Sequence, residues 1–446
     1  MMGSFSIWQR LLTAAFAAGA LAGATPVYAQ ANEQFIPVLV YRSGAYAPNG
    51  IPWANGFVDY LNLVNERDKG INGVKITYEE CETGYATDRG VECYERLKGK
   101  GPTGAAAFNP LSTGITFALT EKAPGDKIPI ITMGYGRSES ADGSVFTWNF
   151  PLLGTYWTAA DVIMHQIANK LGGYEKLKGK KVTLVYHDSP YGKEPIPLLS
   201  ALAKQWNFDF KSIPVTHPGV EQKAAWLQIR QDRPDYVLLW GRGIMNSTAI
   251  KEAVAVNYPR EQMYGVWWSG AEPDVLPAEA GATGYNAAAL QHSSGQTSVH
   301  ADIIKNVYDK GKGSGGIPNN VGTVLYNRGM INAMVTVEAI RTAQAKYGKK
   351  PLTGEQVRWG IENLNLDQAR LRQLGFGGLM QPLKLSCSDH EGARMARIHQ
   401  WDGTKWVYVS DWIEGNNKLL RPMVEEAAKK YAKEKNIVPR DCSKVS

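Results

Sequence analysis

The sequence predicts an α/β protein with two lobes, each containing a parallel β-sheet. Short apolar runs typical of buried strands alternate with stretches of helical spacing, in one series before residue 153 and another after it. Strands and helices that alternate in this way form βαβ units, whose sheets are parallel. The chain has 446 residues, of which 44% are apolar, and this is enough for two ordinary globular domains.

The first series contains four strand-like runs, each followed by a loop. These runs cover 37–42, 74–80, 105–109 and 128–134. Helices are expected to begin near Pro52 and to cover 113–123, because apolar residues recur there at helical spacing.

The second series begins with a helix over 155–173 that two glycines end. Helical patterns at 194–207 and 221–232 flank the segment 210–216, and strands are expected at 181–188, 235–241 and 262–268. The last of these strands ends in the adjacent Trp267 and Trp268, which lead into a Ser-Gly loop.

The remaining part of the chain is less regular. It predicts a long helix over 321–348, and Thr353 with Gln356 has the spacing of a capping box. Alternating apolar residues on either side of Asp402-Gly403 indicate a β-hairpin within 395–412. The charged segment 423–436 is expected to be a helix.

The first 29 residues are expected to be a secretory signal peptide. Arg10 precedes an apolar stretch of small residues, and 27–29 (Val-Tyr-Ala) offers a cleavage site, with 29–31 as the alternative. A membrane anchor is the competing interpretation, but the apolar stretch is shorter than the ~20 residues that span a bilayer. We therefore expect an exported protein that is not embedded in a membrane.

Charge and cysteine content narrow the class further. The formal net charge of +7 comes from basic residues that are dispersed and matched by acidic ones, which argues against a nucleic-acid partner. Four cysteines in an exported chain predict two disulfides. We expect Cys81 to pair locally with Cys93, which leaves Cys387 and Cys442, although four cysteines allow three connectivities. A zinc site is the alternative, but no Cys-x-x-Cys pair or histidine cluster supports it.

Motifs for catalysis are missing from the sequence. The seven histidines show no H-E-x-x-H spacing, and neither a G-x-S-x-G elbow nor a P-loop occurs. Residues 134–137 (Gly-Tyr-Gly-Arg) lack the third glycine of a dinucleotide fingerprint. We therefore expect no catalytic residue, no metal site and no cofactor, and an exported α/β enzyme is a less favoured alternative.

The loops that follow the strands carry the candidate site. In open parallel sheets, ligands bind outside the carboxyl ends of the strands. Six loops there combine glycines with hydroxyls, aromatic rings or arginine; they are 42–46, 109–114, 133–137, 188–192, 240–243 and 267–270. One such loop alone would be ordinary turn chemistry, but six at equivalent places in two lobes predict a binding cleft. The candidate ligand-binding residues are Ser43, Tyr46, Ser112, Thr113, Met133, Gly134, Tyr135, Tyr191, Trp240, Arg242, Trp267 and Trp268.

The order of these motifs resembles that of the periplasmic substrate-binding proteins of ABC importers, of the branched-chain amino-acid (Leu/Ile/Val-binding) type. The resemblance extends to about residue 412. It rests on the loops 43–47, 109–114 and 128–136 and on Asp188-Ser189-Pro190-Tyr191-Gly192, which matches the family's D-x-x-Y-G. It implies that Ser112 and Thr113 hold a ligand carboxylate and that Tyr191 faces the ligand.

The resemblance also implies a type I periplasmic binding fold, with two hinged Rossmann-like lobes that close on a small-molecule ligand. The first lobe would contain 32–152 and 287–380, the second 153–286 and 381–412, and a helical tail 413–446. Such a protein is a non-enzymatic monomer of the periplasm that delivers its ligand to a membrane permease. A disulfide in the first lobe is consistent with this family.

One departure from the family concerns the ligand. Amino-acid binders of this type place a Glu after a strand of the second lobe, to pair with the ligand's ammonium group, and Trp267 stands at or near that place here. A buried ammonium without a partner costs several kcal/mol. We therefore hypothesise a small aromatic or apolar carboxylate or amide, walled by Trp240, Tyr135 and Tyr191 and paired with Arg242 or Arg137.

Alternatives to this hypothesis remain open at the level of sequence. Both tryptophans could pack in the core, and Glu272 could replace the missing Glu in an amino-acid-binding protein. A soluble ligand-binding partner of a sensor would use the same fold.

Overall fold

The computed structural model describes residues 32–293 and 295–444. The predicted signal peptide, 1–29, lies outside the described residues, and so does its cleavage site.

A first sheet is formed by the N-terminal strands. β1 (Glu33–Val40) pairs in parallel with β2 (Lys75–Glu82) along its whole length. The segment 106–108 joins β1 to β3 (Ile130–Ile131), because Ala106 N–H donates to the Phe35 carbonyl and Phe108 bridges Ile130. β3 in turn pairs with β4 (Asn149–Phe150). The strand expected over 105–109 is thus reduced to one bridge.

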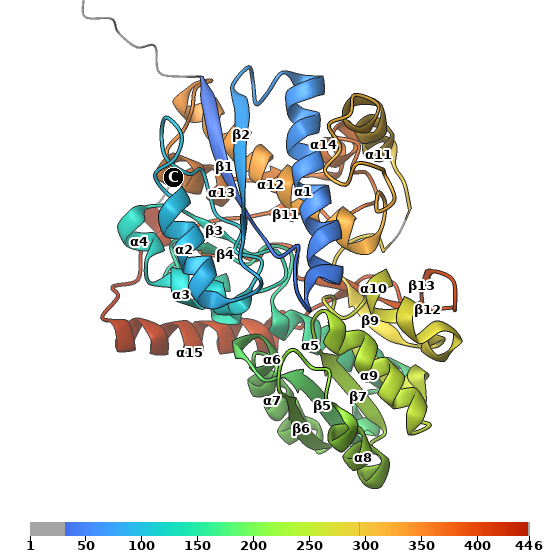
Figure 1. Ribbon diagram of the computed structural model, residues 1–446. Coiled ribbons are helices and arrows are strands. Elements are labelled where there is room, and N and C mark those ends of the chain that lie inside the picture. The colour runs from blue at the N-terminus through green and yellow to red at the C-terminus, as the bar shows by residue number, and fades with distance from the viewer. Residues whose placement is uncertain (1–31, 294, 445–446) are drawn as a thin grey trace, which may run out of the picture. The chain divides into compact units, whose positions relative to one another are not determined.

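Helices surround this first sheet (Figure 1). They are α1 (Ala47–Asp68), α2 (Thr87–Leu97), α3 (Thr113–Thr120), α4 (Ala123–Asp126), α11 (Ser298–Ile303), α12 (Val324–Tyr347), α13 (Gly354–Glu362) and α14 (Gln368–Gln373). The capping box at Thr353 and Gln356 is present and begins α13. β10 (Asn365–Leu366) and β11 (Leu383–Lys384) form a small antiparallel pair.

The long predicted helix is confirmed as α12, and it packs against α1 at very short range. A Cβ on Gly329 would lie 1.9 Å from the Trp53 carbonyl oxygen, and one on Gly56 would lie 2.1 Å from that of Tyr326. Only glycine permits this approach. The neighbouring Arg328 is fully buried.

A second, eight-stranded sheet has the order β13-β12-β9-β8-β7-β5-β6, with β14 paired to β12. Its strands are β5 (Lys181–His187), β6 (Asp209–Val215), β7 (Tyr236–Trp240), β8 (Met263–Gly265), β9 (Asn286–Ala289), β12 (Met395–Trp401), β13 (Trp406–Tyr408) and β14 (Ile413–Glu414). The five strands β5 to β9 are parallel to one another, and β12 is antiparallel to β9. The predicted α/β class and the β12–β13 hairpin are confirmed.

The helices of the second sheet are α5 (Tyr156–Leu171), α6 (Pro190–Lys193), α7 (Ile196–Trp206), α8 (Lys223–Asp232), α9 (Ile244–Ala255) and α10 (Glu272–Val275). β8 ends earlier than predicted. After Val266 donates its N–H to Leu239, a turn closes from the Ser269 N–H to the Val266 carbonyl at 2.7 Å. Both tryptophans of the pair therefore lie in this turn and not in the strand.

The chain passes between the two sheets three times: from β4 to α5, from β9 to the Gln291–Met380 bridge, and from β11 to β12. Two of these crossovers touch, because Leu153 N–H donates to the Glu391 carbonyl at 2.9 Å. β9 is hydrogen-bonded into the second sheet, whereas the expected lobe boundary at residue 287 placed most of this strand in the first lobe. The division into lobes stays a prediction.

Both expected disulfides are present. Cys81–Cys93 joins β2 to α2, and Cys387–Cys442 fastens the C-terminal segment to the loop after β11. The predicted tail helix is α15 (Asn417–Lys435). Among the described residues, none of the helices combines the length and the apolar character that crossing a bilayer requires.

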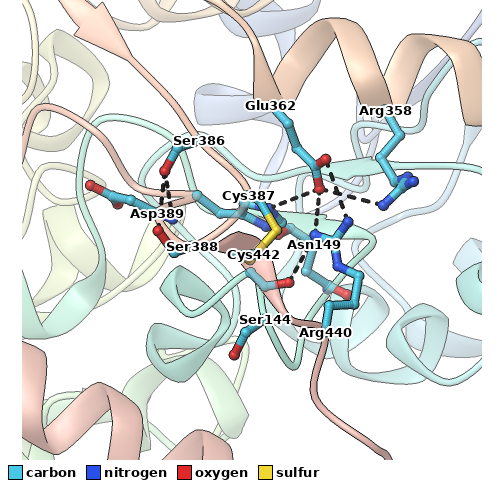
Figure 2. A network of polar contacts seen from close by, with 12 residues as sticks. Ser144, Asn149, Arg358, Glu362, Ser386, Cys387, Ser388, Asp389, Arg440 and Cys442 are labelled. Carbon is cyan, nitrogen blue, oxygen red and sulfur yellow. Dashed lines mark hydrogen bonds and ion pairs between the residues drawn. A yellow bond between two sulfur atoms is a disulfide. The ribbon is translucent and has the colours of Figure 1, made fainter. Parts of the chain in front are cut away.

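Buried charges reinforce the attachment of the C-terminal segment (Figure 2). The Glu362 carboxylate, 2% exposed, lies 2.6 Å from Arg440 Nη2, 3.4 Å from His390 Nε2 and 3.5 Å from Arg358 Nη1. Arg440 also donates to the Gly143 carbonyl at 3.0 Å. The end of the chain is therefore held by a covalent bond and by a buried ionic cluster.

Candidate functional site: a cavity between the two sheets

A narrow cavity lies where loops from both sheets meet. It is lined by Tyr85, Leu111, Ser112, Thr113, Tyr135, Tyr156, Tyr191, Arg242 and Trp268. Each of these residues follows the carboxyl end of a strand or of the 106–108 segment, which is the expected place for a ligand. The free volume is ≈ 10 Å³, about one water molecule. A ligand can enter only when the walls separate.

The wall from the first sheet is rich in hydroxyl groups. Ser112 is the N-cap of α3 and accepts the Ile115 N–H at 3.4 Å, and Thr113 Oγ1 lies 3.2 Å from the Tyr156 hydroxyl. The Tyr135 hydroxyl accepts the Leu111 N–H at 2.8 Å. Burial raises the pKa of Tyr135 and of Tyr156, so these hydroxyls stay protonated at neutral pH.

The two tryptophans share one acceptor but occupy different places. The indole N–H groups of Trp267 and Trp268 donate to the Gly134 carbonyl at 2.6 and 2.7 Å. Trp268 lines the cavity, whereas Trp267 is fully buried and does not line it. A Cβ on Gly154 would lie 3.1 Å from the Trp267 ring, so this indole fills the space behind the cavity wall.

Arg242 is the charged residue of the cavity. It is 3% exposed, and neither of its terminal nitrogens has a hydrogen-bond partner among the described residues. Its guanidinium carbon lies 4.3 Å from the centre of the Trp268 ring. Burial, followed by the charge of Arg328, lowers the pKa of Arg242 to about 9. A cation–π contact returns about 0.5–2 kcal/mol, less than the several kcal/mol that burying an unpaired charge costs.

Arg328 also packs against the Trp268 ring. Its guanidinium carbon is 4.5 Å from the Trp268 ring centre, and it donates to the Trp267 carbonyl at 2.6 Å and to Gln291 Oε1 at 3.2 Å. Because Arg328 belongs to α12 and the tryptophans follow β8, this contact connects the two sides of the cavity.

The buried Asp274 and the partly buried Glu272 lie nearby, but neither carboxylate lines the cavity. Asp274 accepts hydrogen bonds from Asn49 at 3.1 Å and from Asn246 at 2.8 Å. Glu272 accepts the Val324 N–H at 3.2 Å, so it is bound to the start of α12. Burial raises the pKa of Asp274 to about 6 and that of Glu272 to about 7.

Comparison with known proteins identifies the family and the fold. Residues 33–405 match the periplasmic binding protein family. The chain belongs to the periplasmic binding protein family. It is therefore a solute-binding protein with the type I fold, and the family implies a place outside the cytoplasm. The predicted family, fold and binding role are confirmed.

Solved structures agree with this assignment. A protein described as an ABC transporter permease from the Pseudomonas fluorescens group is 46% identical, with a TM-score of 0.85, covering 92% of this chain and 99% of that one. A branched-chain amino acid ABC transporter from Thermus thermophilus with bound valine is 22% identical, with a TM-score of 0.73 and coverages of 88% and 98%. A solute-binding protein from R. palustris in complex with benzoate is 16% identical, with a TM-score of 0.64 and coverages of 86% and 98%. No curated protein matches the sequence.

The structure brings six of the twelve candidate residues to the cavity of this binding protein. They are Ser112, Thr113, Tyr135, Tyr191, Arg242 and Trp268. The other six lie elsewhere: Gly134 supplies the carbonyl shared by the tryptophans, Met133, Trp240 and Trp267 are buried in the core, Tyr46 contacts His187, and Ser43 is exposed.

Three lining residues were not predicted, and one expected partner lies elsewhere. Tyr85 follows Gly84 directly after β2, so the rule that selected the other loops also applies to it. Leu111 lies within the predicted loop 109–114, but its aliphatic side chain was not singled out there, and Tyr156 was assigned only to the helix predicted over 155–173. Arg137 pairs with Glu139 at 2.6 Å and packs on the Phe117 and Tyr431 rings at 4.4 and 4.5 Å, so it is not a cavity residue.

His187, which lies beside the cavity, has a pKa in the acid range. The Tyr46 hydroxyl lies 2.8 Å from His187 Nε2, at a hollow of ≈ 460 Å³ that shares Tyr85, Ser112 and Tyr191 with the cavity. Burial, followed by the charge of His217, lowers the pKa of His187 to about 4. His187 is therefore neutral at pH 7.

The folded protein is expected to lose stability as the pH falls from 6.5 towards 4. In that range the unfolded chain, with an ordinary histidine pKa of about 6.5, takes up a proton that folded His187 rejects. The loss between pH 7 and pH 5 should be about 2 kcal/mol. Urea denaturation of the wild type and of His187→Gln at both pH values measures it. An equal pH dependence in the two proteins would contradict the assignment to His187.

Proposed function

We propose that this periplasmic binding protein captures a small aromatic or apolar carboxylate or amide between two lobes and delivers it to the membrane permease of an ABC importer. The protein would act as a monomer in the periplasm and would bind its ligand without chemical change. The first lobe would contain 32–152 and 287–380, the second 153–286 and 381–412, and 413–446 would be a tail. The boundary at residue 287 would move to the end of β9 (Asn286–Ala289), because this strand belongs to the second sheet.

The composition of the cavity wall carries this proposal. Four tyrosine rings and Trp268 line it, and no aspartate or glutamate of the described part of the chain does. An apolar or aromatic group would be enclosed by rings, whereas the ammonium group of an amino acid would be buried without a carboxylate, at a cost of several kcal/mol. The hydroxyls of Ser112 and Thr113 suit a carboxylate or amide oxygen.

Hinged closure is supported by the size of the cavity and by the crossovers. The site has room for about one water molecule, which is the size expected if two lobes are closed on it. Asn49 of α1 contacts Asp274 of α10, and Arg328 of α12 contacts the turn after β8. Opening would break these contacts while the adjacent crossovers at Leu153 and Glu391 act as the hinge.

The relatives show that the fold accommodates both ligand chemistries, since the T. thermophilus structure holds valine and the R. palustris structure holds benzoate. A branched-chain amino acid is therefore the alternative ligand for this protein. An amino acid carries an ammonium group, whereas an aromatic or apolar carboxylate or amide does not. A direct comparison of the binding of both kinds of ligand therefore distinguishes the two possibilities.

Thermal unfolding with a panel of ligands tests the proposal. Benzoate, phenylacetate or their amides are expected to raise the unfolding midpoint by about 3 °C at a ligand concentration of about 100 times Kd, because binding to the folded state adds about 2.7 kcal/mol. Leucine and valine should leave the midpoint unchanged. A rise with leucine and none with any aromatic or apolar acid or amide would refute the proposed ligand class.

A further inference from the structure

The cavity holds a positive charge that the protein itself does not neutralise. Both terminal nitrogens of Arg242 lack partners among the described residues, although the residue is buried and lines the cavity. Buried polar groups are nearly always hydrogen-bonded. A guanidinium presents two parallel N–H groups that match the two oxygens of a carboxylate. The free edge of Arg242 is therefore a built site for a planar anion.

The surrounding charges do not supply that anion. Asp274 directs one oxygen to Asn49 and Asn246 and the other to the Ala271 N–H at 2.9 Å. Glu272 is engaged by the Val324 N–H. Arg328 adds a second buried guanidinium near Trp268, and its Nη2 also lacks a partner among the described residues. Of these four charged residues, Arg242 alone lines the cavity, and both carboxylates are engaged by other partners.

The position of Arg242 links ligand charge to closure. Its loop follows β7, and the next residues contact the loop after β1, where Ile244 N–H donates to the Ala45 carbonyl at 3.0 Å. Gly243 makes this possible, because its φ is 59° and a Cβ there would lie 2.6 Å from the same carbonyl oxygen. A backbone hydrogen bond thus joins the loop that carries the cation to the first-sheet side.

We infer that the ligand is an anion whose carboxylate is bound bidentately by Arg242, so that the protein selects acids over the corresponding neutral amides. This inference rests on the proposed function and narrows it, since that function leaves acid and amide open. Arg242 is the specificity-determining residue. An amide of the same shape would offer one oxygen and would leave the guanidinium charge buried and unpaired.

Calorimetric titration with matched pairs tests the inference: benzoate and benzamide, phenylacetate and phenylacetamide, isobutyrate and isobutyramide. The wild type should bind the acid of at least one pair about 100-fold more tightly than its amide. Arg242→Gln should abolish that preference by weakening the acid, and Arg242→Lys should retain part of it, because the charge remains without the planar fork. Arg230→Gln, at an exposed arginine of α8, is the matched control and should bind as the wild type does.

Two further measurements do not depend on the panel. Without ligand, Arg242→Gln should unfold at the same temperature as the wild type or higher, because it removes a buried unpaired charge. A compound released from natively purified protein and identified by mass spectrometry should be an anion.

The possible results distinguish a failure of the inference about Arg242 from a failure of the proposed function. Equal affinity for acid and amide in the wild type, an acid preference retained in Arg242→Gln, or a large loss of thermal stability in that variant would overturn the inference and leave the proposed function standing. If no member of any pair binds, the proposed ligand class fails, and the charge of the released compound still decides the role of Arg242.

Discussion

Glu362→Ala is expected to lower the free energy of unfolding by about 3–5 kcal/mol, because removing one partner of a buried ionic cluster leaves the others uncompensated. The carboxylate contacts Arg440 of the C-terminal segment and Arg358 (Figure 2), and it also lies 3.4 Å from His390 Nε2. Burial opposes its ionisation, but His390 and Arg440 outweigh burial and hold the pKa of Glu362 at about 2. The stabilisation should be complete above the unfolded pKa of about 4.5 and should disappear as the pH falls towards 2.

Urea denaturation at pH 7 measures this loss. Glu355→Ala is the matched control, since Glu355 lies on the same helix, is 53% exposed on its side chain and pairs with Lys127 at 3.4 Å. Its replacement should cost less than about 1 kcal/mol, as exposed ion pairs contribute little. Similar losses in the two variants would show that the buried cluster does not stabilise the fold.

Trp267→Ala is expected to cost about 3–5 kcal/mol, the usual range for removing a large buried aromatic side chain. The side chain is fully buried behind the cavity wall, beside Leu290, Gly134 and Gly154. Trp267→Phe should cost less, because a ring still fills most of the space and the Gly134 carbonyl retains the Trp268 N–H.

Trp268, the neighbouring residue, is expected to contribute to ligand binding, whereas Trp267 is not. Trp268→Ala should weaken the binding of an aromatic acid such as benzoate, because Trp268 lines the cavity and contacts Arg242. Trp267→Phe should leave that affinity within a few-fold of the wild type. Denaturation and calorimetry on the same three variants check both effects, and a Trp267→Ala protein as stable as the wild type would contradict the core position of this indole.

Much of the architecture followed from periodicity and local signals. The two series of strands and helices, the long α12, the capping box at Thr353 and the β12–β13 hairpin were predicted, because each depends on residues close together in the chain. The expected strand over 105–109 was less accurate. Three alanines offer little side chain to a sheet, and only Phe108 forms a bridge there.

The site was predicted in outline, because the carboxyl ends of parallel strands meet at one edge. The direction in which each side chain points was not predictable in the same way. The turn from Val266 to Ser269 directs Trp268 to the cavity and leaves Trp267 in the core, although the residues are adjacent and identical in type. Arg242 also has no carboxylate partner, because the nearby Asp274 accepts hydrogen bonds from Asn49 and Asn246 instead. Asn49 and Asn246 lie far from Asp274 in the sequence, so this arrangement was not predictable.

The shared carbonyl of Gly134 gives the molecule a property beyond stability. Two of its 13 tryptophans, Trp267 and Trp268, donate to this one oxygen from the opposite side of the cavity. Any movement that withdraws the turn after β8 from the loop after β3 would break both hydrogen bonds in the same event and would admit water to Trp268, which lines the cavity. The light emission of this indole would then shift to longer wavelength, so the protein would carry a natural optical signal for the separation of its two halves, with no dye attached.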